Sequence, residues 1–84
     1  MTTKSYKQIV EAIESGKRVA FTEKQHTQKR TTRYSYTVSI DGTEYGVSAA
    51  SWNKLNKNHS LRTIDTNSYS SGSHFFQVYT REIA

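Results

Sequence analysis

The sequence predicts an α+β fold of two layers, in which two helices cover one face of a mostly antiparallel sheet of about five strands. Apolar residues recur at helical spacing in two segments, and apolar and polar residues alternate in the others. The connections between these segments are short. The predicted order is therefore α-β-β-β-α-β-β, and the 84 residues fit a single small domain spanning residues 1–84.

The first helix is predicted over residues 5–15, where apolar side chains stand at offsets of 0, 3, 4 and 7. These side chains are Tyr6, Ile9, Val10 and Ile13. Ser5 and Gln8 have the spacing of a capping box, and Gly16 stands where a left-handed cap would follow the helix. Both ends of this helix are therefore marked in the sequence.

Three strands are predicted before the second helix. Residues 18–23 alternate in polarity, residues 24–30 form a polar and mobile loop, and residues 33–40 alternate again. Asp41-Gly42 is a two-residue hairpin signal, which fixes the register with the strand that follows. The expected cross-strand pairs are Ile40 with Thr43, Val38 with Tyr45, and Tyr36 with Val47.

The second helix is predicted from Ala49 to about Lys57. Ser48 can cap its start, Asn58 can end it, and Trp52 and Leu55 would face the sheet. Trp52 is expected to be the anchor between helix and sheet.

Two strands are predicted to close the chain, over residues 60–66 and 74–82, with a flexible turn over residues 67–73 between them. From alternation, the helix-covered face is expected to carry Val19, Phe21, Tyr36, Val38, Tyr45, Val47, Phe76 and Val78. The open face would then receive Arg18, Arg33, Phe75, Tyr79 and Arg81, together with many Ser and Thr residues.

Composition excludes several classes of protein. The absence of cysteine excludes disulfides, thiolate nucleophiles, iron–sulfur clusters and Cys-ligated zinc, which suits a reducing cytoplasm. No apolar run reaches the length of a membrane span, and the N-terminus lacks the apolar stretch of a signal peptide. We therefore expect a cytoplasmic protein without a membrane partner or a cofactor.

The net charge of +5 is clustered, since residues 17–33 contain six Lys or Arg and one acidic residue. Such patches commonly bind phosphate backbones, although a basic loop can also be merely solvated. Aromatic rings on the last strand offer planes for stacking on single-stranded bases, with a homodimer interface or an ordinary core as the alternatives. The predicted nucleic-acid-binding residues are Lys17, Arg18, Lys24, Lys29, Arg30, Arg33, Phe75, Tyr79 and Arg81.

Neither catalysis nor metal binding is expected from the sequence. The histidines at 26, 59 and 74 are scattered, and none has a second ligand at the spacing typical of zinc sites. His59 or His74 near Glu82 would be the candidates for a ribonuclease, but no spacing marks them as a pair.

The favoured function is therefore a small, basic, non-enzymatic nucleic-acid-binding protein. RNA or another single strand is favoured over duplex DNA, because no predicted helix has a basic face for a groove. The alternative is an inhibitor or adaptor of a host enzyme that presents an exposed strand or residues 24–30 to an acidic protein surface. A toxin-like ribonuclease is the third hypothesis. Small size, no Pro or Cys, and abundant Ser, Thr, Tyr and Lys also resemble bacteriophage accessory proteins with counter-defence roles.

A homodimer is predicted from the last strand. Its outward-facing Phe75, Tyr79 and Ile83 would leave an aromatic face or an unpaired edge to be covered, and the strand lacks the usual protective Pro or bulge. Pairing with a second copy would cover it and double the basic surface.

Overall fold

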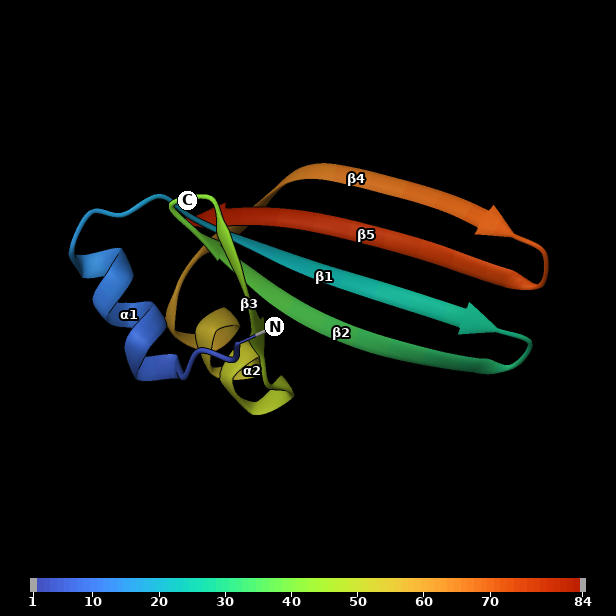
Figure 1. The fold of residues 1–84 in the computed structure, drawn as a ribbon, viewed down its shortest axis with the longest axis horizontal. Helices are drawn as coiled ribbons and strands as arrows, with labels where there is room; N and C mark the ends of the chain where they lie inside the picture. Colours follow the sequence, from blue (N-terminus) through green and yellow to red (C-terminus); the bar gives the residue numbers. More distant parts are fainter. Residues whose placement is uncertain (1, 84) are drawn as a thin grey trace.

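A computed structural model describes residues 2–83, and it confirms the α+β fold and the predicted order of elements (Figure 1). The elements are α1 (Tyr6–Glu14), β1 (Val19–Gln28), β2 (Thr31–Ile40), β3 (Thr43–Val47), α2 (Ala49–Asn58), β4 (Leu61–Ser71) and β5 (His74–Ile83). The strands form one antiparallel sheet in the order β3-β2-β1-β5-β4. The last strand is therefore paired with the first in the middle of the sheet.

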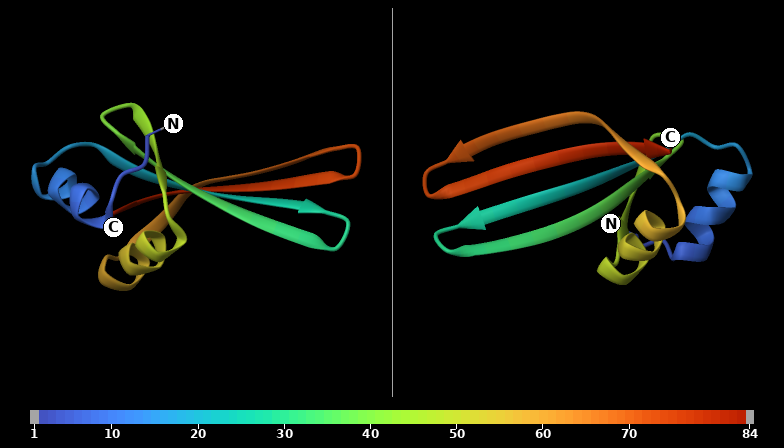
Figure 2. Two further views of the ribbon diagram at one scale, coloured as in Figure 1. Left: turned by 60° about the horizontal axis from the view of Figure 1, so that its bottom comes forward. Right: turned by 180° about the vertical axis from the view of Figure 1, so that it is seen from behind.

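The molecule is elongated, with principal extents of 42 × 23 × 22 Å. Both helices and β3 lie at one end, and the β1–β2 and β4–β5 hairpins extend side by side well beyond them (Figures 1 and 2). We call this extension, residues 24–35 and 66–78, the distal sheet. Neither of its faces is covered by a helix (Figure 2).

The predicted helix caps are confirmed. At the start of α1, the Gln8 N–H donates to Ser5 Oγ over 3.2 Å, and the Ser5 N–H donates to Gln8 Oε1 over 3.0 Å. Gly16 follows the helix with a φ of 77°, which glycine adopts at little cost. Ser48 caps α2 by accepting from the Ser51 N–H over 3.2 Å. Within residues 2–83, neither helix combines the length and the apolar character that crossing a bilayer requires.

The core lies between the helices and the near half of the sheet. Its buried side chains are Ile9, Ala12, Phe21, Val38, Ile40, Val47, Trp52 and Leu55. Trp52 is only 2% exposed, stacks on Tyr36 with 4.8 Å between ring centroids, and meets Phe21 edge-on at 6.1 Å. These contacts make Trp52 the anchor between α2 and the sheet, as the sequence predicts.

Tyr36, which stacks on Trp52, has a perturbed hydroxyl. Partial burial raises the pKa of this hydroxyl, and the carboxylate of Glu23 adds to this effect.

The hairpins are longer than the sequence predicts. Residues 24–28, expected in a loop, complete β1, so that only Lys29 and Arg30 form the turn to β2. Residues 67–71, expected in a flexible turn, complete β4, and Gly72 and Ser73 form the turn to β5. Both stretches are polar on each face of the sheet because no core lies beneath them. They therefore lack the polar–apolar alternation by which strands are recognised.

The predicted faces of β5 are wrong. Phe21 of the core is paired with Arg81, and His26 is paired with Phe76. Directly paired residues share a face, so Phe75, Tyr79 and Arg81 lie on the helix-side face and Phe76 and Val78 lie on the opposite one. Ile83 packs against the core at the end of β5 that lies beside the helices. Because side chains alternate along a strand, this contact puts the odd-numbered residues of β5 on the helix-side face.

The position of β5 excludes one of the two grounds for the predicted homodimer, an unpaired edge. The other ground, an exposed aromatic face, is not affected, so the homodimer stays a prediction. β5 lies between β1 and β4, so it has no unpaired edge, and Phe75 and Tyr79 do not flank one. The outer strands of the sheet are β3, which has an isolated bridge between Gly46 and Thr3, and β4.

Replacing Trp52 by alanine should lower the free energy of unfolding by about 3 to 5 kcal/mol, because a buried aromatic side chain leaves a cavity that the small core cannot close. Urea denaturation followed by circular dichroism measures this loss. Asn53→Ala, at the exposed neighbouring position of α2, is the matched control and should change stability by less than about 0.5 kcal/mol. Equal stabilities of the two variants would contradict the anchoring role.

Candidate nucleic-acid interface

The open face, which we define as the sheet face opposite the helices, carries a row of large side chains across the distal sheet. Strand register aligns Arg33 of β2 with His26 of β1, His26 with Phe76 of β5, and Phe76 with Tyr69 of β4. Residues paired directly across antiparallel strands have their side chains on one face, about 5 Å apart. Four strands therefore bring together residues that are up to 50 positions apart in the chain.

Three members of this row and His74 form an aromatic column. The ring centroids of Tyr69 and Phe76 are 4.8 Å apart, those of Phe76 and His26 are 4.5 Å apart, and those of His26 and His74 are 5.0 Å apart. The corresponding interplanar angles are 19°, 7° and 23°. The first two spacings match the distance between neighbouring strands, so Tyr69, Phe76 and His26 stack on one another across the sheet. His74 is on the same strand as Phe76 and lies beside His26 at the edge of this stack. Tyr69 is on the outer strand and 44% exposed, so its outer ring face has no stacking neighbour among the described residues.

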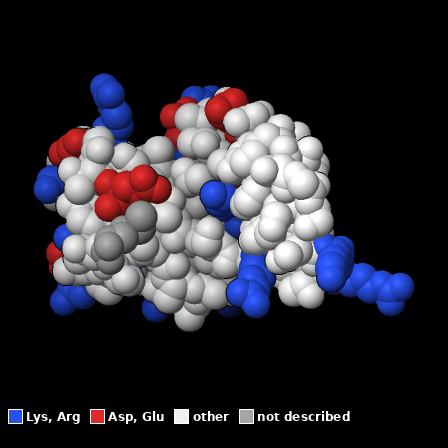
Figure 3. Space-filling model, turned by 45° about the vertical axis from the view of Figure 1, so that its right-hand side comes forward, with Lys and Arg blue, Asp and Glu red and all other residues white. Residues whose placement is uncertain are grey.

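Positive charge is concentrated around the column. Lys24 places its Nζ atom 5.0 Å from the centroid of the Phe76 ring, a cation–π contact. The distal sheet contains four Lys or Arg and no Asp or Glu, whereas the rest of the chain contains eight basic and seven acidic residues. Most of the net charge of +5 therefore belongs to this part of the sequence. In Figure 3, Lys and Arg atoms project along the lower edge at the right without Asp or Glu atoms beside them, whereas both kinds of atoms are seen at the left and top.

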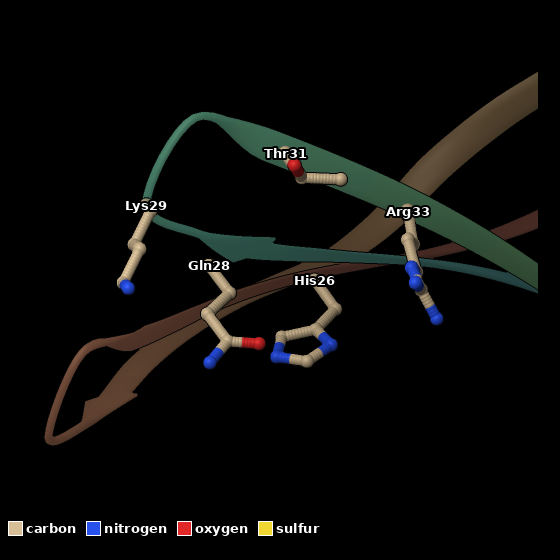
Figure 4. A pocket seen from close by; sticks show the side chains of 5 residues that line it. All are labelled: His26, Gln28, Lys29, Thr31 and Arg33. Carbon is tan, nitrogen blue, oxygen red and sulfur yellow. The ribbon is translucent and has the colours of Figure 1, made fainter.

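A hollow of about 310 Å³ opens at the turn end of the column. It is lined by His26, Gln28, Lys29, Thr31 and Arg33 (Figure 4). The side chains of His26, Gln28 and Arg33 project to the same side of the hairpin in this view. A second hollow, of about 340 Å³, also has His26 and Arg33 in its lining and continues toward Lys24 and Phe76. The open face is thus indented along the β1–β2 hairpin.

Two histidines that the sequence leaves unpaired lie in direct contact here. His26 Nε2 and His74 Nδ1 are 2.8 Å apart, a hydrogen-bond distance. The pair joins β1 to β5, with His26 directly opposite Phe76 and His74 two residues before it on β5. The expectation that the histidines are scattered is therefore wrong for these two, although among residues 2–83 no group of three or more His, Asp or Glu side chains is placed to hold a metal ion.

The structure separates the predicted binding residues into three groups. Lys24 and Arg33 lie on the open face beside the column, and Lys29 and Arg30 form the adjoining turn. Lys17 and Arg18 precede β1, so the ten-residue strand, about 33 Å long, separates them from that turn. Arg18 instead fixes the near end of β1, where its N–H donates to Asp41 Oδ1 over 3.0 Å.

The remaining three predicted residues, Phe75, Tyr79 and Arg81, lie on the helix-side face. The Arg81 guanidinium lies 4.0 Å from Glu23 Oε2 and 5.8 Å from the Tyr79 ring centroid. Phe75 is 46% exposed near the hairpin end. This group is thus on the other side of the sheet from Lys24 and Arg33.

Four residues of the column are absent from the predicted set: His26, Tyr69, His74 and Phe76. One signal in the sequence was available. Gly72-Ser73 is a two-residue hairpin pattern, and centring a hairpin on it pairs Tyr69 with Phe76. No comparable signal marks the β1–β2 turn, because Lys29 occupies a left-handed conformation, with φ at 55°, without being glycine.

Searches of protein-family models, of curated proteins and of solved structures find no match to this chain.

Lys29 and Gly72 hold equivalent positions as the first residues of two-residue turns, with φ values of 55° and 60°. A side chain in this region costs roughly 1 to 2 kcal/mol, and glycine's extra backbone freedom offsets about half of that. Lys29→Gly should therefore leave stability unchanged or raise it by up to about 1 kcal/mol, whereas Gly72→Lys should lower it. Urea denaturation of both variants checks this, and a Lys29→Gly variant less stable than Lys29→Ala would contradict it.

Proposed function

We propose that this protein binds single-stranded nucleic acid, RNA or DNA, on the open face of its distal sheet. The observation that supports this most directly is the aromatic column flanked by Lys24 and Arg33 in a region without acidic residues. Stacking surface and positive charge together are what sequence-tolerant binders of single strands use. The partner is the one that the sequence predicts. The aromatic contacts are instead assigned to the open face, because Phe75 and Tyr79 lie on the helix-side face.

The free end of the column supports a single strand over a duplex. Only the outer face of Tyr69 extends the stack, so a base must leave its own neighbours to lie against it. Unpaired and splayed bases do this readily, while bases in a duplex are stacked within the helix. Neither α1 nor α2 borders the column, so neither helix is placed to carry a groove-reading contact beside it (Figure 1).

Phosphates would contact the basic residues around the column and in the turn. If Lys24, Lys29, Arg30 and Arg33 each neutralise one phosphate, log K should fall against log salt with a slope near −0.7 per contact, about −3 in all. The double variant Lys29→Ala/Arg33→Ala should reduce this slope by about 1.4 and weaken binding to all sequences alike. Fluorescence anisotropy of a labelled ten-nucleotide oligouridylate at several salt concentrations measures both effects.

Lys17→Ala/Arg18→Ala is the charge-matched control for that double variant, because it removes two positive charges from the far end of β1. It should keep a slope close to that of the wild type. Equal slopes for the two double variants would place the binding site elsewhere. Failure of the wild-type protein to bind the oligonucleotide at low salt would contradict the proposed function and favour an acidic protein as the partner.

Stacking on Tyr69 generates a separate prediction, because one stacked base contributes about 1 to 3 kcal/mol. Tyr69→Ala should weaken oligouridylate binding by about 5-fold or more, with the salt slope unchanged. Phe75→Ala is the matched control, since Phe75 is likewise an aromatic residue of the distal sheet, is 46% exposed and lies on the helix-side face. A larger loss from Phe75→Ala than from Tyr69→Ala would show that the strand binds the opposite face.

A further inference from the structure

We infer that the hollow between His26 and Arg33 is a phosphate subsite, and that the His26–His74 pair takes up a proton when a phosphate of the bound strand occupies it. This inference rests on the proposed function, whose site it makes more specific. It assigns the two histidines a role that stacking and fixed charge do not give them.

The lining of the hollow has the chemistry of an anion site. Each of its five side chains can donate a hydrogen bond: the imidazole of His26, the amide of Gln28, the ammonium of Lys29, the hydroxyl of Thr31 and the guanidinium of Arg33. None of them carries a negative charge. A phosphate brings several acceptor oxygens and at least one negative charge, so it complements this set of donors.

The hydrogen bond within the pair limits how much charge the free protein can hold here. A bond between His26 Nε2 and His74 Nδ1 needs one N–H donor and one bare nitrogen as acceptor. If both rings were protonated, both nitrogens would carry hydrogen and the bond would break. At least one ring is therefore neutral as long as the pair is intact.

The charged side chains around the pair are all basic. Lys24 of β1, Arg33 of β2 and Lys29 of the turn are the charged side chains around the pair. On β5 and β4 the neighbouring rings, Phe76 and Tyr69, are uncharged at neutral pH. The open-face carboxylates nearest along the strands belong to Asp65, opposite Thr80, and to Glu82. These are four and six residue steps from Phe76, or about 13 and 20 Å.

A phosphate in the hollow reverses this balance, because its negative charge favours an additional proton on the pair. The bound state then holds more protons than the free state, so affinity rises as pH falls. Histidine ordinarily titrates between pH 5 and 8, which sets the window. Above this window an imidazole carries no charge, so this contribution to binding is lost.

The test is the binding of a ten-nucleotide oligouridylate, carrying a pH-insensitive dye, at constant ionic strength between pH 5.5 and 8.5. Uracil does not titrate in this range. We expect the affinity of the wild-type protein to rise about ten-fold for each proton taken up per pH unit within the window, and to level off above pH 8. The double variant His26→Gln/His74→Gln keeps hydrogen-bonding groups but has no imidazole in the site that can become charged, so it should bind with little dependence on pH.

His59→Gln is the matched control, because His59 is the remaining histidine and lies at the end of α2, away from the distal sheet. It should retain the pH dependence of the wild type. Calorimetry of the wild-type protein near pH 7, in buffers of different ionisation enthalpy, counts the protons directly and does not depend on any variant folding. We expect an uptake of up to one proton per complex.

Binding that is independent of pH, or an uptake of no protons, would overturn the inference and leave the proposed function standing. A pH dependence that survives in the double variant His26→Gln/His74→Gln would also overturn it. Absence of oligonucleotide binding at every pH would instead contradict the proposed function itself. Circular dichroism melting of each variant separates these outcomes from loss of the fold.

Discussion

The antiparallel pairing of β1 with β5 is the constraint on which the other features depend. It joins the first strand of the sheet to the last and unites two long hairpins into one four-stranded extension. Its register also decides which side chains meet on each face. With His26 opposite Phe76, the open face receives the histidine pair and the aromatic column, and the helix-side face receives Phe75, Tyr79 and Arg81. A shift by one residue would exchange these two sets of side chains.

Local signals explain why much of the fold can be predicted from the sequence. Ser5 and Gln8 mark the start of α1, and Asp41-Gly42 fixes the β2–β3 register, because caps and tight turns are determined by residues close together in the chain. The helices pack on the half of the sheet that carries apolar side chains. The distal sheet gives fewer such signals. Gly72-Ser73 marks the β4–β5 turn, but no comparable pair marks the β1–β2 turn, and no core imposes a polar–apolar alternation on these strands. The length of the distal sheet, the faces of β5 and the meeting of His26 with His74 all follow from non-local pairing.

The aromatic column has a structural role as well as the proposed binding role. Cross-strand aromatic pairs contribute roughly 0.2 to 1 kcal/mol each, and the distal sheet has no buried core to hold its strands together. Stacking of Phe76 between Tyr69 and His26 links β4, β5 and β1 within the distal sheet, away from the helices. Phe76 is thus chiefly a stabilising residue. In the proposed complex, the binding energy would come from the exposed end of the column at Tyr69 and from the charges around the column.

This arrangement separates the source of stability from the proposed binding site. The buried residues and both helices lie at one end of the 42 Å molecule, and the basic distal sheet lies at the other. Exposed substitutions at Lys29, Arg33 or Tyr69 remove no contact with the buried cluster, so they can change affinity without unfolding the domain. The same separation leaves the distal sheet free of helices on both faces, which gives an extended strand access along its whole width.

The left-handed conformation of Lys29, at the tip of this sheet, is a local conformational cost that the fold does not require. It is consistent with a position whose charge matters more than its contribution to stability.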